Sequence, residues 1–136
     1  MDTLATILRA AQLYAHAAHN GAKGPTFFAD HEFLGELYGS YETAYDKVIE
    51  RSIGLGEPLD LAAVGRNAAA DAGRYSDPLT FSQQQSLQVL MDYERKICTE
   101  IDGIYDEAST GTQNLLAQLA DDSEARQYQI GQRLKP

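Results

Sequence analysis

Two histidines and two carboxylates in the first half of the chain are of the types that bind metal ions. His19 precedes a turn that contains Gly and Pro, His31 follows it, and Asp46 and Glu50 lie further along the same helical pattern as His31. The 15 residues from His31 to Asp46 span roughly 22 Å of helix, whereas bonds from nitrogen or oxygen to a metal are about 2 Å long. If these side chains share an ion, a second, antiparallel copy of the helix must supply half of the ligands.

The two carboxylates are four residues apart, so they leave one face of a helix. Such a pair is most often a solvated acidic face, but the histidines favour a metal site. If a two-fold axis passes near Gly39 and Ser40, His31 of one chain lies beside residue 48 of the other, midway between the two carboxylates. Small residues at this crossing let two helices approach at the near end of the 8–10 Å range of interaxial distances.

The type of ligand limits the choice of metal. Imidazole and carboxylate ligands without thiolate suit iron, while zinc and manganese accept the same ligands, and the spacing alone leaves the three open. Open positions on Fe(II) would admit dioxygen or peroxide. We therefore expect iron, with zinc as the alternative ion in the same site.

Composition excludes several classes of partner. The 136 residues fit one domain, residues 1–136. The 11 Lys and Arg against 20 Asp and Glu give a net charge of −9, so phosphate backbones and anionic membranes would repel the chain. No apolar run approaches the 18 residues of a membrane span, and the acidic start, with no base before Arg9, is unlike a signal peptide. Cys98 is the only cysteine, which excludes an internal disulfide. We expect a cytoplasmic protein.

Four segments show the three-to-four spacing of amphipathic helices, and none shows the alternation of a strand. The predicted helices cover residues 3–18, 25–53, 82–105 and 112–134. The crossover over residues 57–78 is too long for a bare loop and is expected to hold a short helix over residues 60–64. Two helical hairpins joined by a long crossover predict an all-α, ferritin-like four-helix bundle.

About a third of the chain carries a more specific pattern. The stretch from His19 to Glu32, HNGAKGPTFFADHE, and the stretch from Asp46 to Arg51, DKVIER, resemble the signature of the Dps family, the miniferritins. By this resemblance, His19 and His31 would be ferroxidase ligands from one subunit, and the two carboxylates would be ligands from its two-fold neighbour. The family builds hollow dodecamers that oxidise Fe(II), preferably with hydrogen peroxide, and store ferric mineral inside.

Two positions depart from the family pattern. Asn20 stands where the family has a redox-active Trp, a role for which the chain offers only its eight Tyr residues. Gly35 stands four residues beyond His31, where the family commonly has an acidic residue. Glu36 is adjacent but is turned about 100° around the helix, so we expect reduced metal affinity.

The DNA binding that some family members achieve through basic termini is not expected here. The chain begins with an acidic residue, and only Arg133 and Lys135 lie near its end. A dodecamer would carry twelve times −9, or −108, and the phosphate backbone would repel it.

Two other interpretations stay open. The larger ferritins hold a di-iron site inside one bundle on Glu-x-x-His motifs, but this sequence has no such motif and its three histidines all precede residue 32. Glu94, inside the apolar stripe of the third long helix, is interpreted either as a member of a buried ion pair or as a sign that the stripe is partly exposed. The remaining alternative is a non-catalytic helical assembly, in which the histidines and acids hold the two-fold interface or bind a structural zinc.

Overall fold

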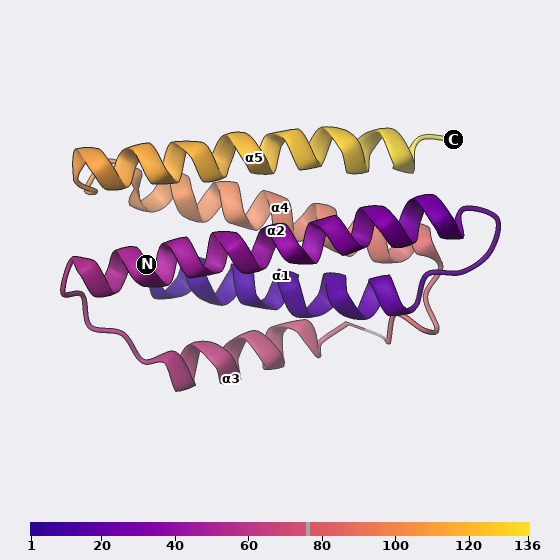
Figure 1. Cartoon of the computed structure of the whole chain (residues 1–136), viewed down its shortest axis with the longest axis horizontal. Helices are drawn as coiled ribbons and strands as arrows, with labels where there is room; N and C mark the ends of the chain where they lie inside the picture. Colours follow the sequence, from indigo (N-terminus) through magenta and orange to yellow (C-terminus); the bar gives the residue numbers. More distant parts are fainter. Residues whose placement is uncertain (76) are drawn as a thin grey trace.

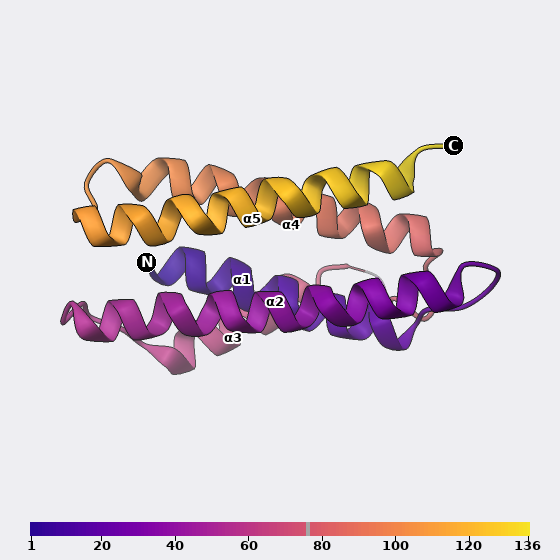
Figure 2. The same ribbon diagram turned by 45° about the horizontal axis from the view of Figure 1, so that its top comes forward.

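Five helices make up the secondary structure of the computed structural model, which describes residues 1–75 and 77–136. They are α1 (Asp2–Asn20), α2 (Phe27–Gly54), α3 (Leu61–Ala72), α4 (Gln83–Tyr105) and α5 (Thr110–Leu134). Antiparallel α1 and α2 form one hairpin, α4 and α5 form another, and the two hairpins lie against each other (Figures 1 and 2). This arrangement confirms the predicted all-α class.

The first hairpin is held by apolar stripes on both helices. Residues at three-to-four spacing are buried on α1 (Leu4, Leu8, Ala11, Ala15, Ala18) and on α2 (Leu34, Leu37, Tyr41, Ala44, Val48). In the turn between the helices, Gly24 has a φ of 82°, a conformation that side chains with a Cβ disfavour. Gly21 is required for another reason, because a Cβ there would lie 2.9 Å from the backbone oxygen of Pro78.

The crossover helix α3 is longer than the short helix predicted over residues 60–64. Alanine, the best helix former, recurs along its length and carries the helix to Ala72. The Asp60 side chain caps its start by accepting a 2.9 Å hydrogen bond from the Ala63 amide. Val64 and Ala68 are buried, and α3 packs along α1, at the side of the bundle away from α5 (Figure 1).

The four long helices begin and end within two residues of the predicted boundaries. The start of α4 is fixed by a capping box, in which Ser82 and Gln85 satisfy each other's backbone amides. None of the described helices is long and apolar enough to cross a membrane.

A buried polar cluster joins α2, α4 and α5 inside the bundle. The fully buried Glu94 accepts hydrogen bonds from Nε of Arg126 at 2.6 Å, from Oγ of Ser123 at 2.6 Å, and from the hydroxyl of Tyr41. Of the two interpretations of Glu94, the buried ion pair is confirmed and the partly exposed stripe is wrong, because the Glu94 side chain is fully buried. Burial, with the charge of Glu94, raises the pKa of Tyr41 well above its usual value. Burial alone would lower the pKa of Arg126, but its bonds to Glu94 raise it overall.

Candidate metal site

His19 and His31 meet beside the turn of the first hairpin. His19 lies in the last turn of α1 and His31 in the second turn of α2. Their ring centroids are 3.7 Å apart, with 32° between the ring planes. The structure therefore brings together the two imidazoles that the sequence singled out.

One hydrogen bond fixes the orientation of the His19 ring. Its Nδ1 lies 2.7 Å from the backbone oxygen of His31. A carbonyl oxygen only accepts, so Nδ1 carries the hydrogen, and in the neutral ring the lone pair is left on Nε2. Histidines that bind metals commonly donate their second ring N–H to a carbonyl or carboxylate in this way. The ring of His19 is therefore prepared to bind a metal through Nε2.

Gly35 provides the space in which this ring lies. A Cβ at position 35 would be 3.3 Å from both Cε1 and Nδ1 of His19, closer than the optimal separation of about 3.5–4.0 Å between carbon atoms. The Dps pattern commonly has an acidic residue at the position of Gly35. In this chain, the absence of a side chain at Gly35 leaves room for the imidazole of His19.

Aromatic rings extend the site in both directions. Tyr38 lies edge-on to His19 at 5.3 Å and is stacked with His16 at 4.2 Å between centroids, while Phe27 lies 5.0 Å from His31. Neither Tyr38 nor His16 was predicted from the sequence to lie at the site. The available signal was spacing, because His16 and His19 are three residues apart on α1 and therefore share a face.

The acid next to His31 is already engaged. Asp30, which is buried, receives two hydrogen bonds of 2.9 Å from Arg133 at the end of α5 and one of 2.6 Å from the Thr26 hydroxyl. Burial alone would raise the pKa of Asp30, but the hydrogen bonds from Arg133 and Thr26 lower it overall. Asp30 therefore ties α2 to α5 and does not complete the pair of histidines.

Asp46 and Glu50, the other predicted ligands, lie exposed on α2. Because α2 is continuous from Phe27 to Gly54, roughly 22 Å of helix separates Asp46 from His31 of the same chain. In the part of the chain that the structure describes, no three His, Cys, Asp or Glu side chains are close enough to hold a metal ion.

Comparison with protein families matches residues 2–135 to the ferritin-like domain. The chain belongs to the ferritin-like family. Iron storage and ferroxidase activity are common in this family. A search of curated proteins gives no match.

Other bundles of this type hold a di-iron centre between their helices, on Glu residues and Glu-x-x-His motifs. The interior of this ferritin-like bundle is different. Both carboxylate oxygens of Glu94 are bonded to Arg126, at 2.6 and 3.2 Å. A guanidinium therefore neutralises Glu94 where a di-iron bundle would use a metal. The histidine pair is the better candidate for a metal site in this ferritin-like chain.

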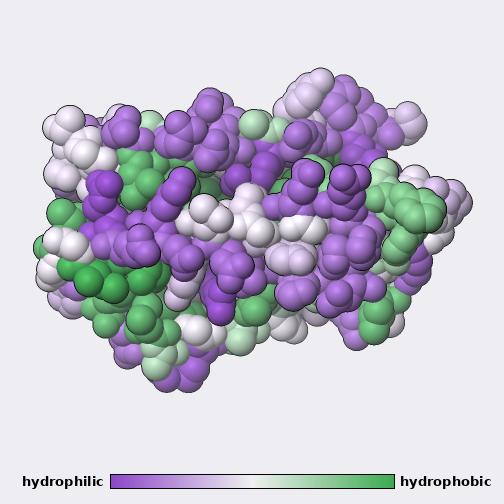
Figure 3. Space-filling model, in the orientation of Figure 1, coloured by the Kyte–Doolittle hydropathy of each residue, from purple (hydrophilic) through white to green (hydrophobic). Residues whose placement is uncertain are grey.

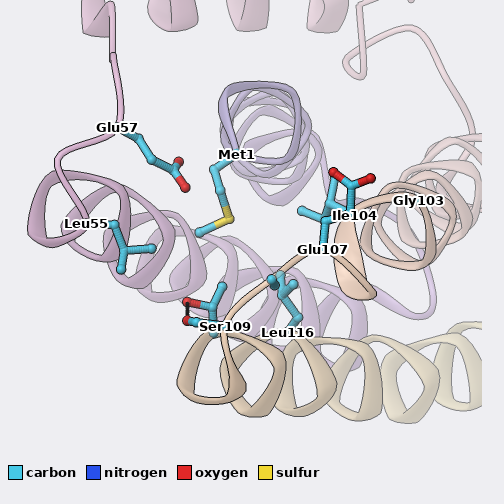
Figure 4. A pocket seen from close by; sticks show the side chains of 10 residues that line it. Met1, Leu55, Glu57, Gly103, Ile104, Glu107, Ser109 and Leu116 are labelled. Atoms are coloured by element: carbon cyan, nitrogen blue, oxygen red, sulfur yellow. Dashed lines mark hydrogen bonds between the residues drawn. The ribbon is translucent and has the colours of Figure 1, made fainter.

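A cavity of about 340 Å³ lies at the other end of the ferritin-like bundle (Figure 4). The Met1 side chain points into it, and Glu57 and Glu107 lie on opposite sides of it (Figure 4). Its lining contains no imidazole, and Met1 is separated from His19 by about 27 Å along α1. We therefore place the candidate metal site at the histidines.

Proposed function

We propose that this chain is a Dps-like ferroxidase whose metal sites are completed by a second copy. His19 and His31 of one chain, with Asp46 and Glu50 of its two-fold mate, would bind Fe(II) as the substrate. Peroxide or dioxygen would oxidise the iron, and the ferric product would be stored inside a hollow oligomer, for which we propose a dodecamer.

The hydrogen bond from Nδ1 of His19 to the backbone oxygen of His31 is the observation that carries this proposal. It leaves Nε2 as the metal-binding atom of a ring that is already oriented. Two imidazoles are fewer ligands than the two histidines and one carboxylate of a common Fe(II) site. The exposed carboxylates of Asp46 and Glu50 are the donors that an antiparallel copy would add.

The proposed ligands suit the oxidation of iron. Two carboxylates offset two positive charges and interact more strongly with Fe(III) than with Fe(II), because the Coulomb attraction grows with the charge of the ion. Two Fe(II) ions would each give one electron to hydrogen peroxide, whose O–O bond breaks, and the two Fe(III) ions would then take up water and release four protons as they form oxyhydroxide. The negative charge of the chain favours the approach of a cation.

Mixing two inactive variants tests whether the sites are shared. We expect His31→Ala to abolish the Fe(II) oxidation that is followed at 300–350 nm, and Asp46→Ala combined with Glu50→Ala to do the same. In a mixed dimer of these variants one of the two sites would have all four ligands, so random mixing would restore about a quarter of the sites. Tyr128→Ala, which removes an exposed side chain on α5, is the control and should keep the wild-type rate.

The mass of each assembly is measured in the same buffer, so that exchange of subunits is established independently of activity. Exchanged but inactive mixtures would contradict a shared site. A wild-type assembly that binds zinc and oxidises no Fe(II) would show the non-catalytic alternative instead.

A further inference from the structure

An ion pair joins the end of α5 to the start of α2, beside the histidine pair. Nε and Nη2 of Arg133 each donate to the Asp30 carboxylate at 2.9 Å, across 103 positions of sequence. Asp30 is 2% exposed, so its buried carboxylate depends on this guanidinium for a partner charge. The two helix ends lie at the same end of the bundle (Figures 1 and 2). In Figure 3, hydrophilic surface over the end of α5 meets apolar surface over the start of α2, so the visible surface offers no apolar patch shared by the two ends.

The same ion pair engages the residue that begins α2. Thr26 is the N-cap of α2, but its side chain does not cap the helix by accepting a hydrogen bond from a backbone amide, as N-cap hydroxyls commonly do. Its hydroxyl oxygen instead accepts a 3.1 Å hydrogen bond from Nη2 of Arg133, and the hydroxyl donates to Asp30 at 2.6 Å. The start of α2 is therefore held by a side chain of α5 in place of the usual cap.

The histidine of α2 lies on the next ridge of the same turn. Thr26 and Asp30 are four residues apart, and so are Phe27 and His31, so each pair shares one ridge of the helix. The ring of Phe27 lies 5.0 Å from the ring of His31, and the backbone oxygen of His31 accepts the hydrogen bond from Nδ1 of His19. A movement of this turn would therefore move both the His31 ring and the acceptor that orients His19.

We propose that Arg133 is a positioning residue of the candidate metal site, which acts through Asp30 and Thr26 to hold the first turn of α2 where His31 can orient His19. A guanidinium has donors only and offers a metal no lone pair, and neither of its two partners is a proposed ligand. The inference rests on the proposed function for the identity of the site, but positioning can be measured without any oxidation of iron.

The chemistry of arginine suits this role. A guanidinium is planar and offers its donors in a fixed fork, and Arg133 uses that fork to reach both oxygens of Asp30 and the hydroxyl of Thr26. A lysine ammonium is a point charge on a flexible stem, so it would keep the charge but hold the turn less firmly. Arg133 also lies in the last turn of α5, where a cation is favoured by the helix dipole.

Zinc binding by the metal-free protein tests the proposal, because Zn(II) accepts imidazole and carboxylate ligands and has no redox chemistry. Loss of a group that orients a metal-binding histidine commonly costs 10–100-fold in affinity, and Arg133 acts one step further out, so we expect Arg133→Met to weaken Zn(II) binding about three- to tenfold in a calorimetric titration. Arg133→Lys should lie between this variant and the wild type. Lys135→Met is the matched control and should keep the wild-type affinity, because the exposed Lys135 ammonium donates only to its neighbour Gln132.

The orientation of His19 gives a second readout, which a loss of stability alone would not change. In NMR of metal-free protein labelled with 15N-histidine, the neutral ring of wild-type His19 should carry its hydrogen on Nδ1, whereas Arg133→Met should show a mixture of the two tautomers. The double variant Asp30→Leu with Arg133→Leu removes the hydrogen-bonded tie without leaving a buried unpaired charge, a replacement that is often neutral for stability. It should stay folded and still bind Zn(II) more weakly than the wild type.

Wild-type Zn(II) affinity in both Arg133→Met and the double variant would overturn the proposal, because the ion pair would then serve stability alone. Unchanged nitrogen shifts of His19 in Arg133→Met would overturn it as well. A wild-type protein that binds no Zn(II) at the histidines would instead reject the metal site of the proposed function, and the tautomer of His19 would still decide whether Arg133 positions its ring.

Discussion

At the scale of single residues, the contact between Gly35 and the His19 ring gives a direct prediction. In Gly35→Ala, the new methyl group would lie 3.3 Å from Cε1 and Nδ1 of His19, so the ring would have to shift by a few tenths of an ångström, which strains its hydrogen bond to the carbonyl of His31. Complete loss of such an orienting bond commonly costs 10–100-fold in metal affinity, so we expect strain in it to weaken Fe(II) affinity by up to about tenfold in an anaerobic titration.

The matched control is Gly65→Ala on α3, because a Cβ there would meet nothing within 4 Å. It should leave Fe(II) affinity unchanged and stabilise the helix by up to about 1 kcal/mol. Equal Fe(II) affinities for Gly35→Ala and the wild type would show that the orientation of His19 does not affect metal binding.

The types and spacing of His19 and His31 were readable from the sequence, and so was the expectation that a short turn brings them together. The hydrogen bond to the His31 carbonyl and the place of Gly35 under the ring were not. Sequence periodicity gives the direction of a side chain around its helix, but both of these features depend on the distance between two helices and on a ring rotamer. The sharing of Asp46 and Glu50 with a second chain stays a prediction.

At the scale of helices, the buried cluster around Glu94 is expected to contribute strongly to stability. Arg126→Met would leave a fully buried carboxylate without its cation, and breaking a buried pair in this way costs about 3–5 kcal/mol. Adding Glu94→Gln removes the uncompensated charge and should recover much of this loss. Urea unfolding of the wild type, the single variant and the double variant measures both effects; equal losses in the two variants would contradict the prediction.

The boundaries of the four long helices could be predicted because apolar stripes, glycines and prolines mark them locally. The prediction for α3 was too short, since the stretch from residue 65 to 72 has no large apolar side chain and its helix rests on alanine propensity, an Asp60 cap and contact with α1. Glu94 was recognised as an exception in an apolar stripe. Arg126 was not identified as its partner, because the two residues are brought together only by the packing of α4 on α5.

At the scale of the whole molecule, three buried tyrosines make stability sensitive to alkaline pH. Burial is the first cause of a raised pKa for Tyr14, Tyr41 and Tyr93. A tyrosine in the unfolded chain has a pKa near 10. Above that pH, the unfolded chain loses these protons while the folded chain keeps them, so stabilisation that is complete below pH 10 is lost as the pH rises. Each such group lowers the free energy of unfolding by up to about 1.4 kcal/mol per pH unit.

We therefore expect Tyr41→Phe to make the alkaline decline shallower by about 1.4 kcal/mol per pH unit, as measured by urea unfolding between about pH 10.5 and 12. Tyr128→Phe, which removes an exposed hydroxyl, is the control and should follow the wild-type slope. Parallel curves for Tyr41→Phe and the wild type would contradict this assignment.

The ion pair in the middle of the bundle also bears on when the chain can act. Since a guanidinium already neutralises Glu94 there, any iron chemistry would fall to groups on the outside of the bundle, and the described residues of a lone chain bring together two imidazoles but no group of three metal-binding side chains. If the sites are shared as we propose, dilution to monomers switches the enzyme off, and ferric product forms only where subunits have already built the compartment that receives it.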